Sequence, residues 1–117
     1  MIVGDLPGGI YATIDGHVHA ARYVRGRPFV TLIDDGDRCV DRADVDRLFR
    51  RTVSGRWQGE PVTVWAARSP GTVRVQYDGD DPSRARALGM WGDRTMWELE
   101  VVPGEVTVTN VDEIDLP

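Results

Sequence analysis

The stretch YATIDGHVHAARYVRGRPFVTLIDDGD, residues 11–37, decides the fold. It alternates short runs of β-forming residues with turn residues at Asp15-Gly16, at 25–28 and at the acidic stretch 34–37. Asp-Gly is a preferred two-residue hairpin turn, because both central positions need a positive φ. The stretch therefore predicts a three-stranded antiparallel meander that ends in an acidic turn.

An offset of 43 residues aligns this stretch with a second one, and no gap is needed from Ile14 to Asp37. Asp-Gly turns and period-two runs such as Val62–Ala66 and Thr72–Tyr77 recur at matching places, so the second stretch also predicts a meander. The identical pairs are Gly16 and Gly59, Arg25 and Arg68, Val30 and Val73, Asp35 and Asp78, Gly36 and Gly79, and Asp37 and Asp80.

The repeat predicts a mainly β chain built from two small SH3-like β-meanders or partly open barrels. The first covers residues 1–53, and the second covers 54–117 and holds the one short helix. A single unit of this size would be marginally stable, whereas two packed units would share a core. One compact domain, with a continuous curled antiparallel sheet and the helix against one face, is the alternative.

The two copies differ after their acidic turns. In the first copy, Ala43–Arg51 is predicted as a short helix or turn, with Val45, Leu48 and Phe49 on one side. In the second copy, an insert covers residues 82–97 and is followed by strands at 96–102 and 106–109.

The insert begins with a predicted helix at 83–88. Asp81 can cap the start of this helix, Pro82 suits its first turn and Gly89 can end it.

Composition indicates a soluble protein. The 117 residues carry a net charge of −5, and all 14 basic residues are Arg. The sequence shows no basic stripe for nucleic acid and no apolar run near the roughly 20 residues of a membrane span. Met1–Asp5 also lacks the basic start and apolar run of a signal peptide, so a cytoplasmic location is expected.

Candidate catalytic and metal-binding residues are few. Cys39 is the single cysteine and is expected to be a small buried group. His17 and His19 share a strand face but lack an evident third metal ligand. Glu98 and Glu100 alternate with apolar residues and are expected to face water. We expect no enzyme activity, no metal and no cofactor.

A protein partner is the favoured ligand. Trp91 lies in a flexible Gly-rich setting within the insert, and tryptophan is enriched at binding hot spots. The acidic turns offer a surface that complements a basic partner. The expected partner-binding residues are Asp34, Asp35, Asp37, Asp78, Asp80, Asp81 and Trp91.

Three short stretches carry a resemblance: Tyr11–Gly16, Ala87–Met90 and Val101–Val106. With them, the chain resembles small actinobacterial immunity proteins of toxin–immunity loci, including those of polymorphic toxins and type VII secretion. The resemblance covers about half of the chain. It implies a non-catalytic inhibitor that neutralises a cognate secreted toxin. We expect the chain to be a monomer or weak dimer.

The alternative function is an SH3-like accessory domain or a small-ligand barrel. It requires a concave groove in which Trp57, Trp65 and Tyr77 converge with exposed rings. Buried rings would instead indicate that these residues build the scaffold.

Overall fold

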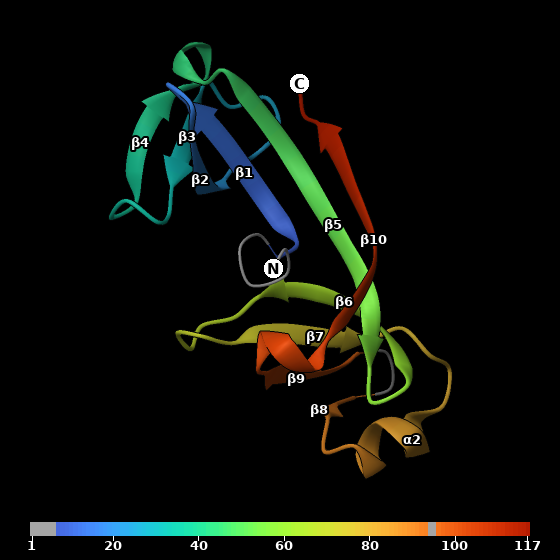
Figure 1. The fold of residues 1–117 in the computed structure, drawn as a ribbon. Helices are drawn as coiled ribbons and strands as arrows, with labels where there is room; N and C mark the ends of the chain where they lie inside the picture. The colour runs from blue at the N-terminus through green and yellow to red at the C-terminus, as the bar shows by residue number, and fades with distance from the viewer. Residues whose placement is uncertain (1–6, 94–95) are drawn as a thin grey trace. The chain divides into compact units, whose positions relative to one another are not determined.

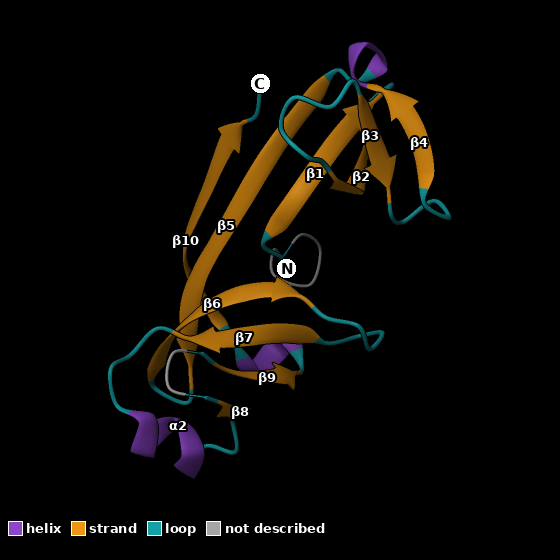
Figure 2. Ribbon diagram, turned by 180° about the vertical axis from the view of Figure 1, so that it is seen from behind, coloured by secondary structure: helices purple, strands orange, loops and turns teal. Residues whose placement is uncertain are grey.

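The computed structural model describes residues 7–93 and 96–117. The N-terminal stretch Met1–Asp5 and residues 94 and 95 of the insert lie outside the described residues. Strands make up 55% of the structure, and they form an open antiparallel sheet with one short helix. The prediction of a mainly β chain is therefore confirmed (Figures 1 and 2). The tandem SH3-like repeat is not confirmed and stays a prediction.

The chain divides into two compact units. The first unit comprises Gly9–Arg51 and Glu113–Pro117, and the second comprises Thr52–Asp112 with the stretch that ends at Gly8. Two long strands contribute residues to both units: β5 (Arg47–Trp57) and β10 (Thr107–Asp115).

The first unit is an antiparallel sheet in the order β4-β3-β2-β1-β5. Its hairpin turn at Asp15-Gly16 has φ values of 50° and 81°, as the sequence predicts. The buried core of this unit consists of Ala12, Ala21, Val30, Leu32, Val45 and Leu48. The strands other than β5 are β1 (Gly9–Ile14), β2 (His17–Arg22), β3 (Phe29–Leu32) and β4 (Arg38–Asp41).

The short helix or turn predicted over Ala43–Arg51 is present only at its start, and the prediction is wrong from Arg47 onward. A 3₁₀ helix, η1 (Arg42–Asp44), is followed by the strand β5, which pairs with β1 from Arg47 to Arg51. Leu48 and Phe49 are both buried although successive strand residues point to opposite faces. Burial on both faces removes the alternation that identifies a strand, so the apolar spacing resembled that of a helix.

The second unit is an antiparallel sheet in the order β5-β6-β7-β9-β8. Gln58 and Gly59 form its first hairpin turn with φ values of 52° and 78°, close to those of the first unit. In Figure 1, β6, β7 and β9 lie side by side. The strands after β5 are β6 (Glu60–Ala66), β7 (Val73–Tyr77), β8 (Trp91–Gly92) and β9 (Trp97–Val101).

Helix α2 (Pro82–Ala87) covers part of this unit's core. The Asp81 carboxylate accepts hydrogen bonds from the backbone N–H groups of Ser83 and Arg84, and Gly89 follows the helix with a φ of 83°. The predicted roles of Asp81 as the cap, Pro82 in the first turn and Gly89 at the end of the helix are therefore confirmed. Ala85 is the helix residue fully buried among the core, alongside Met90 and Trp97.

Strand β10 follows a 3₁₀ helix, η2 (Pro103–Glu105), and pairs with β5. It is longer than the predicted strand at 106–109. At Gly55 of β5, a Cβ atom would lie 2.6 Å from the Thr107 carbonyl oxygen. Glycine at this position therefore permits the close approach of the two strands.

Candidate functional site

The sheet of the second unit has one apolar and one polar face. Val62, Val64, Val73 and Val75 alternate along β6 and β7 into the core. The residues between them point to the other face, because side chains alternate along a strand. Strand register places Thr63, Gln76, Glu98 and Trp91 in one cross-strand row, and Trp65, Arg74 and Glu100 in the next.

Trp91 ends the first of these rows, on the short strand β8 at the edge of the unit's sheet. Its side chain is 68% exposed, as the sequence predicts for this residue. Met96, on the other arm of the β8–β9 hairpin, is 48% exposed. The hairpin is closed by a hydrogen bond from the Asp93 N–H to the Met96 carbonyl oxygen, 3.1 Å long.

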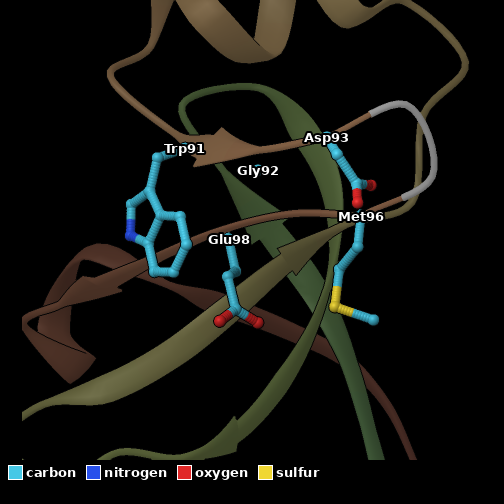
Figure 3. Close-up of a pocket in the computed structure, with 5 residues that line it drawn as sticks. All are labelled: Trp91, Gly92, Asp93, Met96 and Glu98. Atoms are coloured by element: carbon cyan, nitrogen blue, oxygen red, sulfur yellow. The ribbon is translucent and has the colours of Figure 1, made fainter.

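A hollow of about 380 Å³ lies beside Trp91. Trp91, Gly92, Asp93, Met96 and Glu98 line it, and the Trp91 and Met96 side chains stand on either side of Glu98 (Figure 3). A second hollow, of about 590 Å³, adjoins it at Trp91 and Glu98. Its other lining residues are Ala66, Ala67, Arg68, Arg74 and Glu100.

Hydrogen bonds connect side chains of neighbouring strands on the polar face of the sheet. Arg74 Nη1 donates to Glu98 Oε2 over 3.0 Å, and Trp65 Nε1 donates to Gln76 Oε1 over 3.1 Å. A hydrogen bond from the Ser69 side chain, outweighing the opposing effect of burial, lowers the pKa of Glu100. Glu98 is only partly exposed, so the expectation that it simply faces water needs correction: it is an ion-paired wall of the hollow.

In the acidic turn of the first unit, one carboxylate is hydrogen-bonded and another is ion-paired to an arginine. Asp34 contacts His19 Nδ1 at 3.2 Å and accepts a hydrogen bond from the Ala20 N–H, and Asp35 accepts from Arg38 Nε over 2.8 Å. Asp37 is exposed and has a φ of 58°, a conformation that Asp and Asn tolerate in tight turns.

The acidic turn of the second unit also supports the fold. Asp78 accepts a hydrogen bond from the Thr63 hydroxyl over 2.6 Å, and Asp81 caps α2. Asp80 is exposed. The two acidic turns belong to different units, and their role in binding stays a prediction.

The aromatic groove required by the alternative function is not formed. Trp57 and Tyr77 are 5% and 9% exposed and belong to the core, whereas Trp65 points to the opposite face of the sheet. The three rings therefore do not converge. The burial of Trp57 and Tyr77 matches the scaffold role that the sequence offered as the other possibility.

Cys39 is exposed on β4, so its predicted burial is wrong. It pairs with Thr31 across β3 and β4, and its outward position follows from alternation with Val40, which packs on the core. His17 is exposed, and His19 contacts one carboxylate. Within residues 7–93 and 96–117, no group of three or more His, Cys, Asp or Glu residues is arranged to hold a metal ion.

No protein family model, curated protein or solved structure matches this chain. In the described part of the chain, no helix has the length and apolar character needed to cross a lipid bilayer.

Sequence reasoning found Trp91 but missed Arg74 and Met96 as its neighbours. Arg74 follows the period-two pattern of β7, which places it on the polar face without indicating its partner. The pairing of β7 with β9 brings Arg74 and Glu98 together across 24 residues of sequence. No local sequence pattern predicts the pairing of β7 with β9.

Proposed function

We propose that the chain is a non-catalytic protein-binding module, and that it neutralises a cognate secreted toxin as an immunity protein. The observation that carries the proposal is the exposure of Trp91, at 68%, beside a hollow lined by the β8–β9 hairpin. A large aromatic side chain gains most from burial, and tryptophan is among the residues that dominate binding energy at protein interfaces.

The charge of the chain supports a basic toxin domain as the partner. The net charge is −5, and Asp37 and Asp80 are exposed in the acidic turns. Complementary charge raises association rates and suppresses wrong partners. In this proposal the chain acts in the cytoplasm of the producing cell, as a monomer or weak dimer.

We also propose that the two meanders are SH3-like repeats of one ancestral unit. The backbone supports this: the first hairpin turns of the two units have φ values of 50° and 81°, and of 52° and 78°. The turns lie 43 residues apart, which is the offset of the sequence repeat.

The test is binding of the wild type to the toxin domain encoded beside this chain, measured by calorimetry and by rescue of growth on co-expression. A variant for comparison changes Asp35, Asp37, Asp78 and Asp80 to Asn. Asn keeps the turn conformation of Asp but removes the charge. We expect weaker binding with a reduced salt dependence. Full affinity of this variant would exclude the acidic turns from the contact surface, and no binding by the wild type would overturn the function.

A further inference from the structure

The hollow beside Trp91 is large enough to hold one side chain. Its volume, about 380 Å³, is at the small end of the range of about 300–1,000 Å³ that small-molecule pockets occupy. Two of its walls are the exposed side chains of Trp91 and Met96, which offer an aromatic face and a flexible thioether (Figure 3). The apolar walls suit the aliphatic stem of a long side chain.

The charges in the hollow select the head group of that side chain. Among the lining residues that the structure describes, the two ionisable ones, Asp93 and Glu98, are acidic. The Glu98 carboxylate lies between Trp91 and Met96 (Figure 3), where it can face a bound cation. The face of a tryptophan ring also attracts a cation, and Arg is the commonest partner.

We propose that this hollow binds a single arginine or lysine side chain of the protein partner, stacked on Trp91 with its charge at Glu98. This inference rests on the proposed protein-binding function and names the chemistry that the site recognises. The hollow lies within one unit of the chain, so its lining does not depend on the other unit.

Substitution of Arg74 tests the proposal, because its effect on affinity should have opposite signs for a bound cation and a bound anion. It already donates to Glu98 over 3.0 Å and therefore partly neutralises the carboxylate that the partner's cation would meet. Removing the Arg74 charge leaves Glu98 more negative toward the hollow. R74Q should therefore strengthen the binding of a cation, whereas it would weaken the binding of an anion.

The experiment titrates the full chain with N-acetylarginine methylamide and follows the Trp91 indole N–H and Met96 methyl signals by NMR. N-acetylcitrulline methylamide, which has nearly the same shape but no charge, is the matched control. We expect saturable shifts with the arginine probe and at least threefold weaker binding of the citrulline probe. W91A should weaken arginine binding about twofold to fivefold, the range of an exposed cation–π contact. R74Q should tighten it at least twofold.

Equal shifts with both probes, no shift at Trp91, or weaker arginine binding by R74Q would each overturn the inference. Failure of this inference is distinct from failure of the proposed function. If the toxin domain binds the wild type and W91A equally, the hollow does not contact the toxin, and the proposed protein-binding function is retained. If the arginine probe binds as expected but the toxin domain does not bind, the hollow is retained as an arginine site and the immunity function is rejected.

Discussion

Arg74 on β7 donates from Nη1 to the Glu98 carboxylate on β9 over 3.0 Å, diagonally across the strand pair in which Arg74 lies opposite Glu100. Solvent still reaches both side chains, at 39% for Arg74 and 19% for Glu98. Ion pairs that remain in contact with water contribute about 0–1 kcal/mol, because solvation and side-chain entropy offset the attraction. The pair is therefore expected to add little to the stability of the sheet.

R74Q should accordingly fold as the wild type does. We expect its free energy of unfolding, measured with urea, to change by less than about 1 kcal/mol. A much larger loss would show that Arg74 holds β7 and β9 together, and would contradict the small contribution expected of a solvent-exposed ion pair.

Gly92 controls the position of Trp91. A Cβ atom at Gly92 would collide with the Met96 carbonyl oxygen across the β8–β9 hairpin. G92A should destabilise the chain by about 1–3 kcal/mol, the usual cost of overpacking, and should shift the Trp91 indole signal. The matched control is G104A, because a Cβ atom there meets nothing within 4 Å. Similar stabilities of the two variants would contradict the close approach of Gly92 to Met96.

Substitutions of Asp81 test whether this residue of the second acidic turn has a structural role. Its carboxylate accepts hydrogen bonds from the Ser83 and Arg84 N–H groups at the start of α2. D81A should lose about 0.5–2 kcal/mol in urea unfolding, whereas D81N should lose little because Asn caps helices equally well. Equal losses in both variants would indicate that charge, and not capping, is what Asp81 supplies to stability.

The first unit contains an acid-sensitive cluster. Glu113 receives hydrogen bonds from the Arg51 and Arg47 guanidinium groups, over 2.6 Å and 3.0 Å. Burial alone would raise the pKa of Glu113, but the two arginines outweigh it and hold the pKa below the ordinary value of 4.5. The ionised form is therefore favoured in the folded state, and its contribution is present above about pH 5 and lost as the pH falls through the folded pKa.

E113Q should lose about 1–3 kcal/mol of stability at pH 7, because Arg51 is buried and gives up a charged partner. The difference from the wild type should shrink at pH 3. Urea unfolding at both values tests this, with the exposed Glu105→Gln as control. A difference that is constant with pH would show that Glu113 acts through packing and not through its charge.

Local signals predicted the parts of the fold that depend on neighbouring residues. The turn at Asp15-Gly16 and the Asp81 cap of α2 follow from the preferences of those residues, so the sequence identifies them. The strand over 47–51 was missed because Leu48 and Phe49 are buried on opposite faces, which leaves no alternation to read.

The sequence predicts only part of the candidate site. Trp91 stands out by residue type and by its Gly-rich surroundings, whereas its neighbours are set by strand register. Register between β7 and β9 is a long-range property that the hydrophobic pattern of either strand does not contain. Arg74 and Glu98 could therefore be placed on a polar face from the sequence, but not beside each other.

Protein binding through Trp91 is tested most directly by comparing the affinities of the wild type, W91A and V102A for the toxin domain encoded beside the chain. Val102 is 57% exposed and lies outside the hollow, so V102A controls for the loss of exposed apolar surface. We predict that W91A weakens binding about 30-fold, the size of a hot-spot effect of about 2 kcal/mol, and that V102A binds as the wild type does. Undiminished binding by W91A would contradict a contact through Trp91.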